Sequence, residues 1–139
     1  SERSFLALPI AFQIANAFNA ELSILHVEES FMTDKEMVML RVSVNHYQDL
    51  QKEKAVDSKR IIAEYMEKYN IPKDAVEVLI REGSPRKDIV RIAHKRKFDL
   101  IIMTTTGRDH LVDNIIGSNA ESVLKKSKMS VFTVYTGDK

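Results

Sequence analysis

Four apolar residues near the start of the chain recur at spacings of three and four, which places them on one face of a helix: Phe5, Leu8, Phe12 and Ala15. This pattern predicts an amphipathic helix over about residues 4–18 that ends near Asn19. Pro9 falls inside this helix. Because a proline deep inside a helix costs about 3 kcal/mol, we expect Pro9 in the first turn or at a kink.

Short runs of apolar and β-branched residues predict four strands, at residues 22–27, 75–80, 99–103 and 131–135. Helical patterns separate the strands. Residues 47–69 predict a long helix with one solvated face, and a later helix begins with Ser84 as its N-cap and Pro85 as its first residue. Three apolar residues should form the buried face of that later helix: Ile89, Ile92 and Ala93. Strands that alternate with helices indicate a parallel α/β sheet, in which ligands bind where the strands end.

Residues 28–46 lack this regularity. Their apolar residues form no clean face: Met32, Met37, Met39, Leu40, Val42 and Val44. We expect this stretch to be either a mobile segment or a surface that binds a partner.

The composition narrows the class of protein. A chain of 139 residues suits one domain with a real core, and a net charge of +1 from 21 basic and 20 acidic residues gives no reason to expect nucleic acid or an anionic membrane as partner. The absence of cysteine excludes disulfides and thiolate chemistry. Since no apolar run approaches the ~20 residues of a membrane span and no signal-peptide pattern opens the chain, we expect a cytoplasmic protein.

The candidate chemistry lies where the strand at residues 99–103 ends. Thr104, Thr105 and Thr106 lead into Gly107, and Gly117 and Ser118 follow after nine intervening residues. A glycine lets the backbone approach a ligand closely, and the first N–H groups of a helix attract an anion. This segment therefore predicts a phosphate site.

Each of these residues has a structural alternative. Ser118 and Glu121 match a capping box, which would place a carboxylate at the helix start and compete with phosphate. The threonines also suit an extended strand end. Arg108 either pairs with a phosphate or lies exposed in the loop. The four histidines show no metal-ligand spacing, so we expect no metal site in the protein.

The segment from Asp99 through Gly117 and Ser118 resembles the universal stress protein family, whose nucleotide-binding members carry G-x2-G-x9-G-[S/T] after a strand. The predicted strand at 22–27, the glycine-serine-proline turn at 83–85 and the last strand follow the order of that family. Two residues depart from its motif. Thr104 replaces the first glycine, and Asn119 stands where an apolar residue is usual.

The resemblance implies a doubly wound three-layer α/β sandwich with a mainly parallel five-stranded sheet, formed by one domain over residues 1–139. Ser1 to Ser4 resemble the segment that leaves the first strand of the family, so that strand is expected upstream of residue 1. Four strands are then visible here. A sheet that lacks its central strand should be split in two.

The resemblance also implies a stress-response or regulatory module that binds ATP, with or without Mg²⁺, or another adenine nucleotide. Eight residues are carried over as its site: Val27 at the adenine or ribose, Met103 and Thr104 at the ribose, and Gly107, Arg108, Gly117, Ser118 and Asn119 at the phosphates. Because threonine is β-branched, Thr104 should crowd the ligand and weaken binding. No residue is poised as nucleophile or general base, so any ATP hydrolysis should be slow and incidental.

Two other functions stay open. The first is a dimeric interaction module of the same family that has lost nucleotide binding, which Thr104, Asn119 and the capping box favour. In either case we expect a homodimer through the last strand, between Val131 and Tyr135, because an exposed sheet edge binds a partner strand. The second is a nucleotidyl-transferring enzyme of similar topology, which the missing signature motifs disfavour.

Overall fold

The computed structural model describes residues 2–105 and 116–136. The helices are η1 (Glu2–Leu6), α1 (Ala7–Phe18), α2 (Asp34–Met39), α3 (Val44–Lys68), η2 (Lys73–Ala75), α4 (Pro85–Lys95) and α5 (Ser118–Lys126), where η marks a 3₁₀ helix. The strands are β1 (Leu22–Glu28), β2 (Val76–Glu82), β3 (Leu100–Thr104) and β4 (Ser130–Val134). All four predicted strands are therefore confirmed, with bounds that differ by one or two residues.

The strands form two parallel pairs. β1 pairs with β2, with Leu22 opposite Val76, and β3 pairs with β4, with Leu100 opposite Ser130. Within the described residues the two pairs are not hydrogen-bonded to each other. The parallel α/β class is confirmed, and the sheet is split as expected. The upstream strand that we offered as the reason, and with it the count of five strands, stays a prediction.

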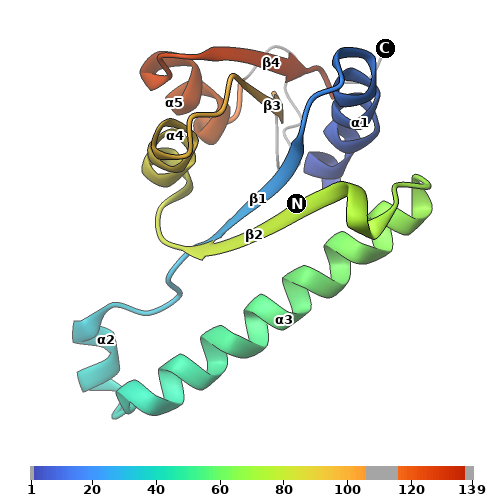
Figure 1. Cartoon of the computed structure of the whole chain (residues 1–139). Coiled ribbons are helices and arrows are strands. Elements are labelled where there is room, and N and C mark those ends of the chain that lie inside the picture. The colour runs from blue at the N-terminus through green and yellow to red at the C-terminus, as the bar shows by residue number, and fades with distance from the viewer. Residues whose placement is uncertain (1, 106–115, 137–139) are drawn as a thin grey trace.

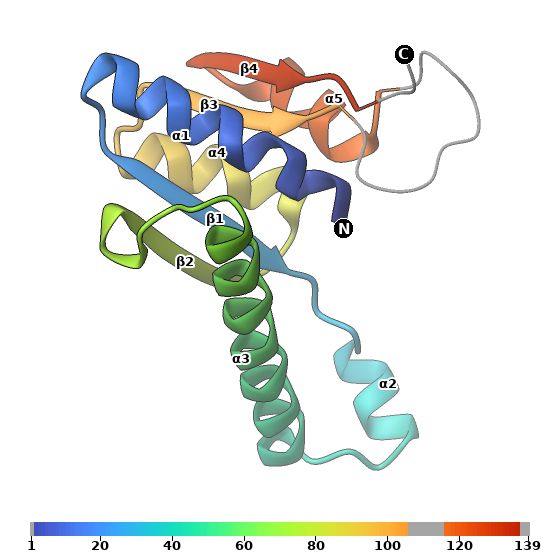
Figure 2. The same cartoon turned by 90° about the vertical axis from the view of Figure 1, so that its right-hand side faces the viewer.

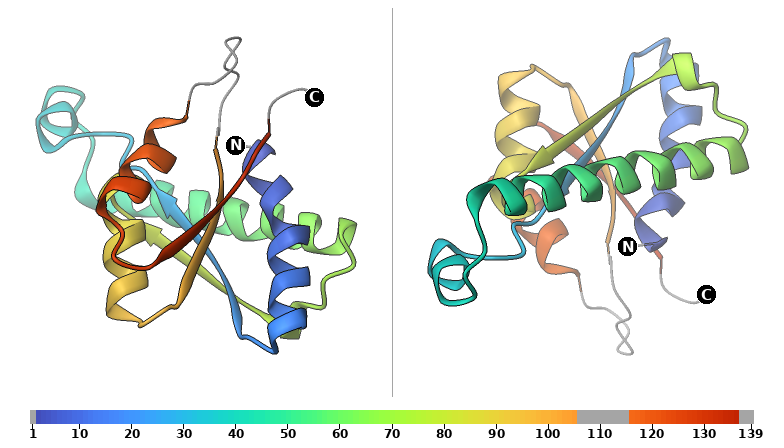
Figure 3. Two further views of the ribbon diagram at one scale, coloured as in Figure 1. Left: turned by 90° about the horizontal axis from the view of Figure 1, so that it is seen from above. Right: turned by 90° about the horizontal axis from the view of Figure 1, so that it is seen from below.

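Helices cover both sides of the strands. Figures 1 and 2 show α1 and α3 on one side and α4 and α5 on the other, and Figure 3 shows α3 crossing β1 and β2 from below. Ser122 of α5 donates a hydrogen bond to the carbonyl of Arg86 in α4 at 3.0 Å, which fixes these two helices side by side. Among the described residues, no helix is long and apolar enough to cross a membrane.

A hydrophobic core lies between the strands and the helices α1 and α3. Five buried residues from α1, α3, the following loop and β2 form it: Leu8, Ile62, Met66, Ile71 and Val76. Pro9 is the third residue of α1, as expected for a proline that costs no helical hydrogen bond. Asn19 ends this helix in the left-handed conformation, with φ 52°, which asparagine tolerates.

Residues 28–46 contain a helix that the sequence analysis did not predict. The hydroxyl of Thr33 accepts a hydrogen bond from the N–H of Glu36, and the carboxylate of Glu36 accepts one from the N–H of Thr33. This capping box starts α2, although the helix is only 6 residues long and buries only Met37. One buried residue in a short helix produces no periodic pattern, so the apolar positions alone did not reveal it.

The start of α4 differs from its prediction in one detail. Ser84 is the N-cap and Pro85 the first helical residue, as expected, but the hydroxyl of Ser84 makes no capping bond. The carboxylate of Asp88 instead accepts a hydrogen bond from the N–H of Ser84 at 2.7 Å and one from Arg91 at 2.9 Å. These bonds, that from Arg91 first, hold the pKa of Asp88 below its ordinary value. Ile89 was expected to be buried and is only half-buried.

Candidate functional site

The end of β3 and the start of α5 lie together. The N–H of Thr105 donates to the carbonyl of Val134 at 3.0 Å, which continues the pairing of β3 with β4 by one residue. The N–H of Gly117 then donates to the carbonyl of Thr105 at 2.7 Å. These two bonds place the N-terminus of α5 at the carboxyl end of the strand pair, where ligands of parallel α/β folds bind.

The predicted capping box at Ser118 is wrong. Gly117 is the N-cap, with φ −61° and ψ 150°, and Ser118 is already the first helical residue, so its hydroxyl makes no capping bond. The carboxylate of Glu121 accepts a hydrogen bond from Lys125 at 2.7 Å, and this bond lowers the pKa of Glu121. A cation one turn further along α5 thus pairs the carboxylate that was expected to repel an anion.

The first three residues of α5 leave their backbone donors outside the helical ladder. Glu121 is the first residue whose N–H reaches a carbonyl of this segment, that of Gly117, at 2.9 Å. The N–H groups of Ser118, Asn119 and Ala120 precede it, and donors at this position carry the positive end of the helix dipole. An anion that lies against them gains both hydrogen bonds and charge stabilisation.

A buried hydroxyl without a partner lies in the same place. Among the buried side-chain atoms of the described residues, only the Oγ1 of Thr105 lacks a hydrogen bond. A buried polar group without a partner costs about 1–3 kcal/mol, which a polar ligand group would recover. Thr105 follows the buried Thr104 directly, so the run of threonines does supply a hydroxyl to this end of the strand.

The other predicted site residues lie in several elements, and some lie outside the described residues. Met103 lies in β3 opposite Thr133, and Asn119 is exposed as the second residue of α5. Val27 is buried in β1, in the other strand pair. Gly107 and Arg108 lie outside the described residues. The part of the chain that is described contains no group of three histidine, cysteine, aspartate or glutamate residues that could hold a metal ion.

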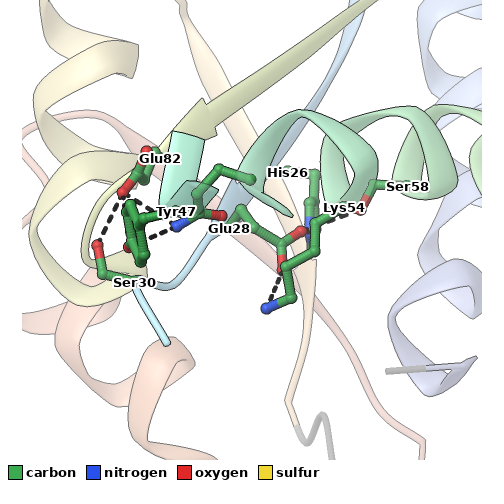
Figure 4. A network of polar contacts seen from close by, with 8 residues as sticks. His26, Glu28, Ser30, Tyr47, Lys54, Ser58 and Glu82 are labelled. Atoms are coloured by element: carbon green, nitrogen blue, oxygen red, sulfur yellow. Dashed lines mark hydrogen bonds and ion pairs between the residues drawn. The ribbon is translucent and has the colours of Figure 1, made fainter. Parts of the chain in front are cut away.

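Sequence reasoning missed a second polar cluster, at the ends of β1 and β2 (Figure 4). The carboxylate of Glu28 contacts His26 at 2.9 Å, Ser58 at 3.0 Å and Lys54 at 3.4 Å. Burial of Glu28 raises its pKa, but the hydrogen bonds from His26, Ser58 and Lys54 and the charge of His26 together outweigh burial, so the pKa is lowered overall. In the sequence, Glu28 is one of two adjacent glutamates after a predicted strand, a pattern that gives no sign of these partners.

Glu82 forms the other half of this cluster. It accepts hydrogen bonds from Ser30 at 3.0 Å, Gln51 at 3.1 Å and Tyr47 at 3.2 Å. Glu28, Gln51 and Glu82 also line a cavity of about 430 Å³ between α3 and the ends of β1 and β2. Because protein donors already satisfy both carboxylates, the cluster ties the loop after β1 and the helix α3 to the strand ends.

Comparison with known proteins gives a consistent result. The model of the universal stress protein family matches residues 1–134. Universal stress protein MJ0531 of Methanocaldococcus jannaschii is 31% identical over 134 residues, which are 96% of this chain and 76% of that protein.

Solved structures share the fold. The hypothetical protein MJ0577 of the same archaeon superposes with a TM-score of 0.69 at 25% identity, over 96% of this chain and 90% of that one. The universal stress protein UspA of Lactobacillus plantarum gives 0.72 at 19% identity, over 93% and 87%. A universal stress protein solved in complex with cAMP gives 0.61 at 22% identity, over 99% and 90%. At 19% and 22% identity, the last two structures show only that the fold is shared.

Proposed function

The chain belongs to the universal stress protein family, and we propose that it is a stress-response module that binds an adenine nucleotide, ATP first among them, at the start of α5. The phosphates lie against the N–H groups of Ser118 and Asn119. One observation carries this proposal: Gly117 bonds to Thr105, so the uncapped N-terminus of a helix stands beside a buried hydroxyl that has no partner.

The nucleotide would extend from α5 along the ends of the strands. Gly107, Gly117 and Arg108 complete the phosphate site, while Met103 and Thr104 border the ribose. Val27, at the end of β1, borders the adenine or ribose. The solved relative that holds cAMP is a universal stress protein with a phosphorylated adenosine ligand. ATP, with or without Mg²⁺, carries the same adenosine and more phosphate charge.

Titration calorimetry with ATP and Mg²⁺ on the native protein and three variants tests the proposal. The Gly107→Val variant should lose binding, because a branched side chain blocks close approach to the backbone. Ser118→Ala should weaken binding several-fold. Ser122→Ala is the matched control, because it removes a serine hydroxyl from the same helix that bonds to Arg86 instead. Equal affinities of the two serine variants would exclude the Ser118 hydroxyl from the phosphate site.

A family member that has lost nucleotide binding is the second candidate function. The departures at Thr104 and Asn119 favour it. Failure of millimolar ATP, ADP and cAMP to bind, in calorimetry and in thermal melts, would favour this interaction module over the nucleotide module.

Both candidates include a homodimer through β4, whose outer edge has no partner strand among the described residues. Val134 is buried and its carbonyl already bonds to Thr105, so a change there would disturb folding. Phe132 is 44% exposed, which makes Phe132→Lys the better test. This change should dissociate the dimer in sedimentation equilibrium and leave the circular dichroism spectrum unchanged. A dimer that persists unchanged in Phe132→Lys would contradict pairing through β4.

A further inference from the structure

Four large apolar side chains are exposed within seven residues at the junction of α2 and α3. Val38, Met39, Leu40 and Val44 are 78%, 71%, 65% and 61% exposed. We call these four residues the apolar tip. Figures 1 and 2 both show α2 and the start of α3 standing away from the strands. Single exposed apolar residues are ordinary, but a contiguous group of them marks a surface that binds a partner.

Hydrogen bonds hold the apolar tip in one conformation. The capping box of Thr33 and Glu36 begins α2, and the N–H of Val42 donates to the carbonyl of Met37 at 2.9 Å. Met37 is the buried residue of this short helix. The hydroxyl of Ser43 then caps α3. Because the tip is already ordered, a partner that binds it loses little conformational entropy in doing so.

Opposite charges lie at the two ends of residues 34–41, which hold three of the four tip residues. Asp34 precedes Val38 by four residues, which places both on one face of α2. Arg41 lies in the turn after α2, where its N–H donates a hydrogen bond to the carbonyl of Val38 at 3.3 Å. In the described part of the chain, neither Asp34 nor Arg41 forms an ion pair. Residues 34–41 therefore begin with an acid and end with a base, and Met37 to Leu40 are an apolar run that follows Lys35 and Glu36.

We propose that the apolar tip binds the apolar tip of a second copy of this chain, antiparallel about a two-fold axis near Val38. This arrangement places Asp34 of each copy beside Arg41 of the other, so both unpaired charges gain partners while the apolar residues leave water. An anionic lipid surface fits less well, because acids at 28, 29, 34 and 36 against bases at 35 and 41 give residues 28–41 a net charge of −2. Residues 34–41, which face each other in the proposed pair, hold two acids and two bases and are neutral overall.

This interface is separate from the one through β4, since Figure 1 shows α2 far from that strand. It also does not depend on nucleotide binding, so the two proposals can fail independently. A chain that uses both interfaces would form larger assemblies than a dimer.

Disulfide cross-linking tests the proposal directly, because the chain contains no cysteine. Val38→Cys should form a covalent dimer under mild oxidation, since the two copies of this residue meet near the axis. Val56→Cys is the matched control, because Val56 is also an exposed valine, 66% exposed, but lies in α3 away from the tip. We expect several-fold more dimer from Val38→Cys. Equal yields from both variants would overturn the proposal.

A charge swap tests the orientation of the two copies. Asp34→Arg and Arg41→Asp should each weaken self-association about tenfold in sedimentation equilibrium, because each places like charges together at both ends of the interface. The double variant Asp34→Arg/Arg41→Asp should restore the affinity. A double variant that self-associates as weakly as the single variants would overturn the proposal. Self-association that Phe132→Lys reduces and Val38→Lys leaves unchanged would also overturn it.

Discussion

Gly83 should be indispensable to the turn between β2 and α4. Its φ is 157°, a conformation that other residues rarely adopt. A Cβ added at this position would overlap Oδ2 of Asp88 and lie 3.1 Å from the Cγ of the same residue. The carboxylate of Asp88 cannot move aside freely, because it accepts hydrogen bonds from the N–H of Ser84 and from Arg91.

Two costs therefore combine in Gly83→Ala. Backbone strain at such a φ is of order 1–3 kcal/mol. Displacement of the Asp88 carboxylate adds the loss of its bond to Ser84, which otherwise satisfies a donor at the start of α4. Equilibrium unfolding in urea should show a lower midpoint with an unchanged slope. Gly117→Ala is the matched control, because φ at Gly117 is −61° and any residue adopts it.

A double-mutant cycle separates the two costs. In an Asp88→Ala background the overlap is gone, so Gly83→Ala should cost only the backbone strain and therefore less than in the native protein. Equal costs in the two backgrounds would show that the carboxylate plays no part. A loss no larger than that of Gly117→Ala would refute the reasoning altogether, because neither strain nor overlap would then be present.

Three further outcomes follow from the structure. The folded pKa of Glu28 lies below its ordinary value of 4.5, so the ionised carboxylate stabilises the protein above about pH 4.5, and this contribution is lost as the pH falls through the lower folded pKa. Glu28→Gln should therefore destabilise the protein by about 1–2 kcal/mol near neutral pH and progressively less in acid. A difference in urea unfolding that does not change with pH would contradict this. Asn119→Asp should raise the melting temperature without ligand, since a carboxylate near a helix N-terminus is favourable, yet weaken ATP binding; affinity that stays the same or increases would argue against phosphate at α5. Ile62→Ala should cost about 2–5 kcal/mol in urea unfolding, whereas Ile61→Ala, at the more exposed neighbouring position, should cost much less; similar losses would contradict the packing of this core.

Local patterns were enough to predict the four strands and the helices α1, α3, α4 and α5 in their order, although not the short helix α2. The apolar spacing of α1, the β-branched runs of the strands and the proline at the start of α4 each act over a few residues, so each can be read without knowledge of the rest of the chain. The meeting of β3 and α5 was also predicted in this way, because a strand end, a glycine and a helix start are adjacent in sequence. The phosphate site at this junction, and its occupant, stay predictions.

Only the tertiary structure decided how the ends of these elements are satisfied. The bond from Gly117 to Thr105 sets the backbone of Gly117 and makes it the cap in place of Ser118, which the sequence had offered as one alternative. Likewise, Glu28 and Glu82 lie at the ends of neighbouring strands but receive donors from α3 that are distant in sequence. Ser58 is 30 residues from Glu28, and Gln51 is 31 residues from Glu82. Such bonds depend on which elements the fold brings together, and a pattern that extends over one helix or strand carries no information about a partner that is distant in sequence.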